Sequence, residues 1–232
     1  MKSGRFNKVF DAEKAIRDEK VSINNKIIAN PNYFFNPKKS LVKINREKIK
    51  KVPLLYFLIN KPAGYLSQKS DNEKTIYDML NKLNLPKEFI NSLFAVGRLD
   101  KDTEGLMIIT NDGKLSNMIM NPKNEIIKKY HVVIDEPVTN ENIRLLEKGV
   151  IIEIDYSNYK TTKCKIRKVK ENEVYISITE GKKRQIRKMF ESIGNDVTYL
   201  KRVSIGGLAL GNLKTGEIKQ ITREEIMEKI EY

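Results

Sequence analysis

The segment 94–113, FAVGRLDKDTEGLMIITNDG, limits the folds open to this chain more than any other stretch. Two apolar runs typical of buried strands flank a short polar loop, and Gly105 lets the chain turn back into the second run. This arrangement would hold the Asp100 carboxylate on a rigid support at the mouth of a pocket. From the spacing alone, a catalytic loop and a polar β-turn whose acids cap backbone amides are equally open interpretations.

A third interpretation takes Asp100 and Asp102 as a magnesium pair for phosphoryl transfer. The sequence has no glycine-rich phosphate loop and no further carboxylate cluster, which argues against it. His131 is the single histidine and Cys164 the single cysteine, so a thiolate zinc cage, a multi-histidine metal site and an intrachain disulfide are excluded. Any chemistry must therefore rest on Asp, Glu, Lys, Arg or Tyr side chains.

The charge of the chain indicates a polyanionic partner. Forty-four Lys and Arg residues face thirty Asp and Glu residues, a net charge of +14. Residues 1–51 alone hold fourteen of the basic residues and five of the acidic ones, which indicates a basic appendage on a less charged body. No apolar run approaches the roughly 18–20 residues of a membrane-spanning helix, and the first ten residues lack a signal-peptide core. We expect a cytoplasmic protein.

The sequence of this basic appendage, residues 1–51, predicts a small α/β module. The sequence predicts a helix over 11–20 capped by Asp11, then a hairpin over 21–28 whose turn is Asn24-Asn25. A strand over 41–45 follows, and the charged run 46–53 is the best candidate for a linker. We therefore divide the chain into residues 1–52 and residues 53–232.

The body alternates strands and helices irregularly. Apolar patterns predict strands over 54–60, 106–110, 126–135 and 197–205 and a hairpin centred on 170–172. Helices are expected over 140–149, capped by Asn140, over 183–194, and in a last segment opened by a Thr222–Glu225 capping box. Since the alternation is partly antiparallel, the pattern favours an α+β fold over a doubly wound parallel sheet.

Two further segments carry side chains suited to nucleic acid. Lys182, Lys183 and Arg184 open a run of cations at the start of a predicted helix, which forms either a phosphate-facing surface or a solvated basic face. Tyr130 lies among lysines on a predicted strand, where it either stacks on a nucleobase or packs in the core with its hydroxyl bonded. His131 alternates to the opposite face, and we interpret it as a structural histidine.

These residues resemble a known family. The strings INKPAGYLS (59–67), GRLDKDTEGL (97–106), KKYHV (128–132), TEGKKRQIRKMFESIGNDV (179–197) and RVSIGGLAL (202–210) occur in this order in pseudouridine synthases of the RsuA/RluB/RluE/RluF group. The resemblance covers residues 54–230. It implies a pseudouridine synthase fold with a central mixed, largely antiparallel sheet. Residues 11–45 resemble the S-four-type (alpha-L) RNA-binding module of this family, although MKSGRFNK is too short and polar to supply its usual first helix.

The resemblance also implies roles for individual residues. Asp100 would be the catalytic aspartate, and Arg98 would enter the RNA helix to hold the target uridine flipped out. Tyr130 would stack on that uracil. Arg187 would pair with Asp100 and keep it ionised, and Lys182, where the family more often has arginine, would still contact phosphate.

The function implied is isomerisation of one uridine of 16S ribosomal RNA, by a monomer acting on a pre-ribosomal small-subunit particle. The reaction needs no metal and no cofactor, because it involves neither a redox change nor an external group. Asp100 could attack C1′, attack C6 or assist a glycal intermediate, and the sequence leaves these routes open. A 23S ribosomal RNA target and a non-catalytic RNA-binding assembly factor are the alternatives, whereas a DNA-binding regulator lacks any helix-turn-helix or zinc signature.

Overall fold

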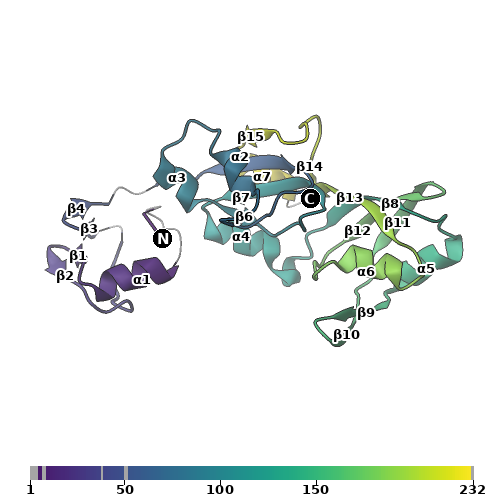
Figure 1. The fold of residues 1–232 in the computed structure, drawn as a ribbon, viewed down its shortest axis with the longest axis horizontal. Helices are drawn as coiled ribbons and strands as arrows, with labels where there is room; N and C mark the ends of the chain where they lie inside the picture. The colour runs from purple at the N-terminus through teal and green to yellow at the C-terminus, as the bar shows by residue number, and fades with distance from the viewer. Residues whose placement is uncertain (1–4, 7–8, 38, 50–51, 231–232) are drawn as a thin grey trace.

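The computed structural model describes residues 5–6, 9–37, 39–49 and 52–230. At one end of the molecule, α1 (Val9–Arg17) accompanies a small antiparallel sheet (Figure 1). Its strands are β1 (Val21–Ile23), β2 (Lys26–Ile27), β3 (Val42–Ile44) and β4 (Glu47–Lys48), in the order β2-β1-β3-β4. The remaining helices and strands form the body of the molecule.

The N-terminal expectations are confirmed in part. Asn24 and Asn25 both have positive φ and form the expected turn between β1 and β2. The helix begins at Val9, so Asp11 lies within its first turn and the prediction that Asp11 caps it is wrong. The linker prediction for 46–53 is also wrong in part, because β4 pairs with β3. Residues 1–4 and 7–8, on which the missing first helix was argued, lie outside the described residues.

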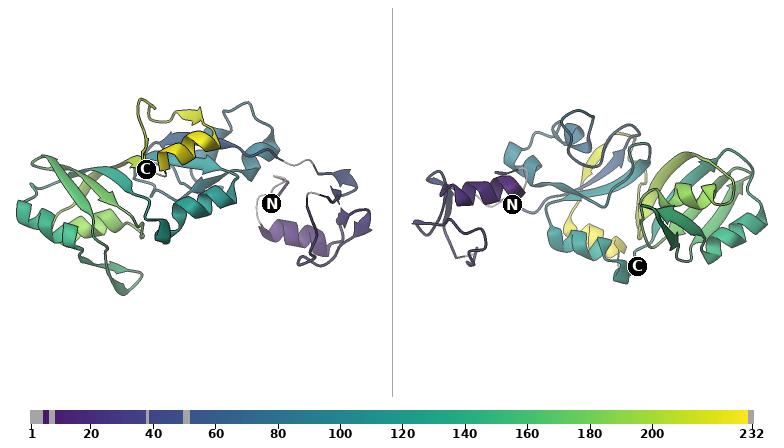
Figure 2. Two further views of the ribbon diagram at one scale, coloured as in Figure 1. Left: turned by 180° about the vertical axis from the view of Figure 1, so that it is seen from behind. Right: turned by 60° about the horizontal axis from the view of Figure 1, so that its bottom comes forward.

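A nine-stranded mixed sheet organises the body. Figure 2 shows the body from two further sides. Its strand order is β11-β12-β8-β13-β7-β5-β15, with β14 on β13 and β6 on β7, and only β13 and β7 run parallel. The strands are β5 (Tyr56–Lys61), β6 (Phe94–Val96), β7 (Glu104–Thr110), β8 (Lys128–Ile134), β11 (Lys165–Lys170), β12 (Glu173–Ile178), β13 (Val197–Ile205), β14 (Leu208–Ala209) and β15 (Ile218–Gln220). The expected α+β class and largely antiparallel sheet are confirmed.

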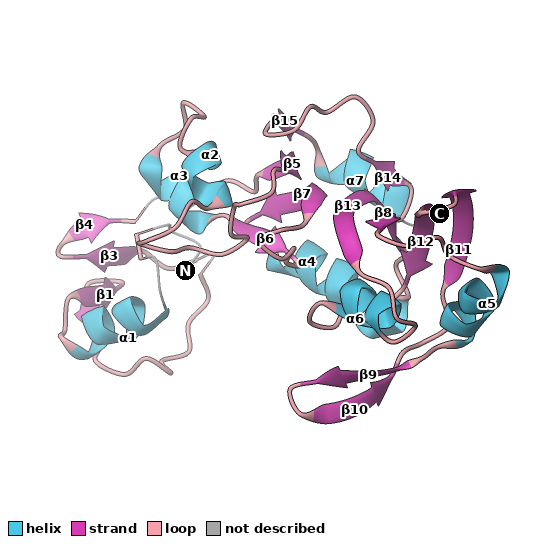
Figure 3. Cartoon of the chain, turned by 45° about the vertical axis from the view of Figure 1, so that its right-hand side comes forward, coloured by secondary structure: helices cyan, strands magenta, loops and turns pink. Residues whose placement is uncertain are grey.

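Helices cover both faces of this sheet. One apolar cluster packs α2 (Ile76–Leu80), α3 (Lys87–Ser92), α5 (Asn140–Lys148) and α6 (Gln185–Glu191) against one face. A second cluster packs α4 (Gly113–Met120) and α7 (Arg223–Ile230) against the other. A single-turn 3₁₀ helix (Pro122–Asn124) and the two-stranded hairpin β9 (Ile151–Ile154) and β10 (Ser157–Lys160) complete the body; the hairpin projects beside α6 in Figure 3.

Two helix ends test the capping predictions. Thr139, rather than Asn140, caps α5, because its hydroxyl accepts a hydrogen bond from the Asn142 amide at 3.1 Å. The capping box before α7 is confirmed: the Thr222 amide donates to Glu225 at 2.8 Å, and the Glu225 amide donates to the Thr222 hydroxyl at 3.2 Å. The sequence pattern did not predict β9 and β10.

Gly105 is required where the parallel strands meet. Its φ is +111°, and a Cβ at this position would lie 2.2 Å from the carbonyl oxygen of Arg202. A side chain would therefore separate β7 from β13 just after the polar loop. No helix in the described part of the chain is long and apolar enough to cross a membrane.

Candidate active site

Two elements hold Asp100 in place. Leu99, the residue before it, is 6% exposed and packs in the larger apolar cluster. The Leu99 amide donates to the Ser67 hydroxyl at 3.0 Å, and this hydroxyl donates back to the Leu99 carbonyl at 2.6 Å. The polar loop then turns through a hydrogen bond from the Thr103 amide to the Asp100 carbonyl at 3.1 Å. The sequence therefore fixes Asp100 by burying its neighbour.

Lys61 supports this loop from beneath. Its side chain is fully buried at the end of β5, and its ammonium donates to the carbonyl oxygens of Thr103, Pro62 and Lys101 at 2.7, 3.1 and 3.2 Å. Burial lowers the pKa of Lys61 to about 8, against the opposing influence of nearby carboxylates, Asp102 and Asp100 foremost. A buried cation thus joins the part of the loop that follows Asp100 to the end of β5.

A cleft of about 510 Å³ opens in front of Asp100. Its lining brings together side chains from the polar loop, β8, β13 and the segment before α6. Six of the seven site residues expected from the sequence line it: Arg98, Asp100, Tyr130, Lys182, Lys183 and Arg184. Arg98 is exposed at the rim, where its guanidinium donates to the Gln68 amide oxygen at 3.3 Å. The seventh residue, Arg187, lies elsewhere.

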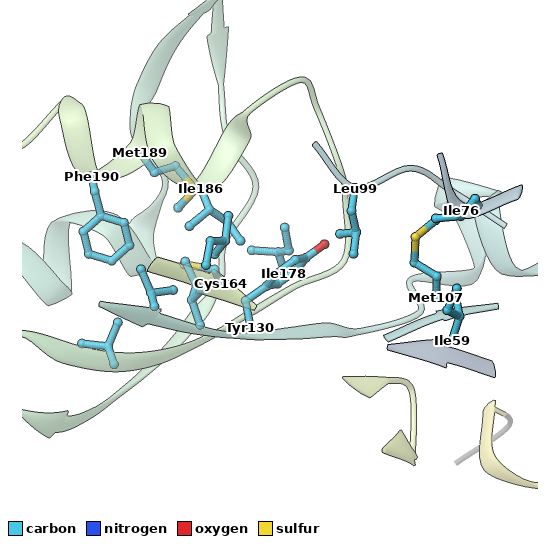
Figure 4. Packing of buried hydrophobic residues seen from close by; sticks show 14 of the residues in the cluster. Ile59, Ile76, Leu99, Met107, Tyr130, Cys164, Ile178, Ile186, Met189 and Phe190 are labelled. Atoms are coloured by element: carbon cyan, nitrogen blue, oxygen red, sulfur yellow. The ribbon is translucent and has the colours of Figure 1, made fainter. Parts of the chain in front are cut away.

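Tyr130 sits on β8, 7% exposed, between the sheet and the cleft. Figure 4 shows its side chain extending past Ile178 toward Leu99, the neighbour of Asp100. Among the described residues its hydroxyl has no hydrogen-bond partner, which differs from an ordinary core tyrosine. His131 points to the opposite face and contacts Glu173 at 2.7 Å, as a structural histidine would.

Arg187 does not pair with Asp100 in this structure, so that expectation is corrected. Its guanidinium lies 3.0 Å from the Asp102 carboxylate and donates to the Val197 carbonyl at 2.6 Å. Arg184 approaches the same carboxylate at 3.4 Å. The physical reason is the loop turn, which directs Asp102 toward α6 while Asp100 lines the cleft. Arg187 therefore ties α6 to the polar loop.

We expect Arg187→Met to lower the free energy of unfolding by about 1–3 kcal/mol, because it removes a charge-assisted hydrogen bond from a mostly buried guanidinium. Asp102→Asn should show a coupling of about 1 kcal/mol with it in a double-mutant cycle measured by urea unfolding. If the double-mutant cycle instead showed coupling between Arg187→Met and Asp100→Asn, and none with Asp102→Asn, the ion pair between Arg187 and Asp100 that the resemblance implies would be correct.

The basic segment before α6 makes mostly exposed contacts. The Lys182 ammonium lies 4.7 Å from the centre of the Tyr159 ring, and the Lys183 ammonium lies 2.8 Å from Asp155 at the turn of the β9–β10 hairpin. Ion pairs this exposed contribute little stability, so phosphate oxygens can displace them at small cost. Three buried cations of the cleft or loop were not predicted as site residues: Lys61, Lys128 and Arg202. A lysine or arginine within or next to an apolar run does not by itself indicate a binding site, because the sequence does not show which cations the fold brings together.

Comparison with known proteins agrees with this geometry. A family model described as RNA pseudouridylate synthase matches residues 55–192. The chain is 40% identical to the uncharacterized RNA pseudouridine synthase YtzG of Bacillus subtilis, over 74% of this chain and 72% of that protein. It is 33% identical to the ribosomal large subunit pseudouridine synthase B of Bacillus subtilis, with 93% and 87% covered. It is 31% identical to the ribosomal small subunit pseudouridine synthase A of Escherichia coli, with 93% and 91% covered.

A solved structure extends the likeness to the fold. The crystal structure of a pseudouridylate synthase superposes with a TM-score of 0.71 at 30% identity, covering 96% of this chain and 94% of that one. The matching family model, the relatives and the shared fold together define an RNA-modifying enzyme. The chain belongs to the RNA pseudouridine synthases, in the group that contains RsuA, RluB and RluF. It is an isomerase.

Proposed function

We propose that this enzyme isomerises one specific uridine of 16S ribosomal RNA, as a cytoplasmic monomer acting on a pre-ribosomal small-subunit particle. The observation that carries the chemistry is the cleft that joins Asp100, Tyr130 and Arg98 to a basic rim. Support for the small-subunit target is the likeness to the small subunit synthase A along 93% of this chain and 91% of that protein. The likeness to the large subunit synthase B, at 33% identity, favours a 23S target as the second candidate.

The proposed roles follow from the positions of the side chains. The uracil leaves its stack and lies against Tyr130, while Arg98 at the rim enters the RNA helix in its place. Asp100 faces the reacting nucleotide, either as nucleophile at C1′ or C6 or as the base that forms a glycal. The C1′–N1 bond breaks, the base turns, and C5 bonds to C1′. The proton on C5 is lost and N1 gains one, so the reaction balances with no co-reactant.

Mapping of pseudouridine in ribosomal RNA from cells with and without this gene tests the proposal directly. Loss of one pseudouridine from 16S RNA, restored by the wild-type gene and not by the gene carrying Asp100→Asn, is the expected result. Loss from 23S RNA alone would make the second candidate correct. Unchanged RNA from both subunits would contradict a ribosomal RNA target.

Phosphate contacts should dominate RNA binding. We expect the logarithm of the binding constant to fall linearly with the logarithm of salt concentration, by about 0.7–0.9 per phosphate neutralised. We assign residues 1–52 to an RNA-binding module, so replacing its exposed Lys14, Lys26 and Lys48 by glutamine should flatten that slope. Fluorescence anisotropy on a ribosomal RNA fragment across a salt series measures it. An unchanged slope would mean that the module does not contact RNA.

A further inference from the structure

The floor of the cleft holds two buried cations with no role in the steps above. Lys128 is 8% exposed and Arg202 is 3% exposed, and both line the cleft. Arg202 on β13 lies directly opposite Tyr130 on β8, and Lys128 precedes Tyr130 by two residues on the same strand. Because side chains alternate along a strand, all three lie on one face of the sheet.

In the part of the chain that the structure describes, neither of these cations makes an ion pair with a carboxylate, although Asp100 lines the same cleft. The Lys128 ammonium donates to the carbonyl oxygens of Ile126 and Thr179, both at 3.3 Å, and Arg202 Nε donates to the Leu106 carbonyl at 2.7 Å. Arg202 Nη2 is buried among the described residues without a hydrogen-bond partner. Burial and the charge of Arg202 both lower the pKa of Lys128.

Such an arrangement costs folding free energy. Two like charges taken out of water repel each other, and an unpaired buried N–H adds a desolvation penalty. Apolar side chains of similar volume would stabilise this part of the sheet better. An anion with several oxygens would neutralise both charges and accept the unpaired N–H. Guanidinium and ammonium groups form their strongest hydrogen bonds with carboxylate and phosphate oxygens.

We propose that Lys128 and Arg202 form a phosphate site that binds the phosphodiester group of the flipped target nucleotide. This inference rests on the proposed function, in which the cleft receives that nucleotide. The uracil lies against Tyr130, and a phosphate attached to the same ribose lies beside it against the two cations. The site thereby anchors the nucleotide from the floor of the cleft, whereas Lys182, Lys183 and Arg184 contact RNA at the rim.

Isothermal titration of the full-length protein with uridine 5′-monophosphate, uridine 3′-monophosphate and uridine tests the site. We expect one of the two nucleotides to bind about 10- to 100-fold more tightly than uridine, the range for hydrogen bonds to a charged group. Lys128→Met and Arg202→Met should each reduce that preference about tenfold or more, and Arg202→Lys should retain part of it. Lys129→Met is the matched control, because Lys129 points to the opposite face, where its ammonium lies 5.0 Å from the Tyr175 ring centre.

Thermal unfolding separates binding from folding. Lys128→Met should keep the wild-type melting temperature or raise it, since it removes one of two unneutralised buried charges. Equal affinity of the wild type for uridine and both nucleotides, or no detectable binding of either nucleotide, would overturn the phosphate site. So would an equal loss of nucleotide and uridine affinity in Lys128→Met. A target mapped to 23S RNA would contradict the proposed 16S target and leave this site intact, because every RNA carries the same phosphodiester group.

Discussion

Asp100→Asn is expected to reduce pseudouridine formation by about 10²–10⁴-fold or more while leaving RNA affinity and melting temperature close to those of the wild type. The amide has nearly the shape of the carboxylate but can act neither as nucleophile nor as base. Leu99 and Ser67 hold the backbone at this position independently of the side chain, so the fold should persist. Single-turnover release of tritium from [5-³H]uridine in the substrate RNA measures the rate.

Asp102→Asn is the matched control for this variant. Asp102 lies two residues along the same loop, but its carboxylate contacts Arg184 and Arg187, and it is not among the residues that line the cleft. We expect a small loss of activity that follows its loss of stability. Substantial turnover by Asp100→Asn would remove Asp100 from the chemistry, and a total loss of turnover in Asp102→Asn alone would transfer the role to Asp102.

Lys61→Met is expected to reduce turnover by about 100-fold, although Lys61 does not line the cleft. Its ammonium donates to two carbonyl oxygens of the loop just after Asp100, those of Lys101 and Thr103, and to the Pro62 carbonyl at the end of β5. Without these hydrogen bonds the loop loses its support. A displacement of about 1 Å at a reacting group lowers the rate by about 100-fold. Lys170→Met is the control, because Lys170 does not line the cleft and its exposed ammonium contacts Glu173 on the neighbouring strand. Equal turnover in both variants would contradict the supporting role of Lys61.

The same lysine gives a prediction for pH. Its pKa is about 8 in the folded protein and 10.5 without the fold, so between these values the unfolded chain binds more protons than the folded one. The free energy of unfolding of the wild type should therefore rise through this interval, by about 3 kcal/mol relative to Lys61→Met. Urea unfolding of both proteins from pH 7.5 to 10.5 measures the difference. Parallel curves would mean that burial does not depress this pKa.

Much of the fold follows from local patterns. The apolar runs at 54–60, 106–110 and 126–135 predicted strands that the structure contains, and the Thr222–Glu225 box predicted the start of the last helix. These signals are local, because burial on a strand and capping of a helix involve residues close in sequence. The hairpin at 151–160 was not predicted, because its strands are short and largely exposed and show no clear apolar alternation.

The sequence by itself determined the family, the place of Asp100 in a polar loop between two apolar strands, and the excess of basic residues. Only the tertiary structure decided which charges meet. Arg187 and Asp102 lie far apart in sequence, and the turn after Asp100 brings them together in place of the expected pair. Lys61, Lys128 and Arg202 read as ordinary cations until strand pairing buries them beneath the loop and the cleft. Long-range charge contacts depend on strand order and register, which no local pattern encodes.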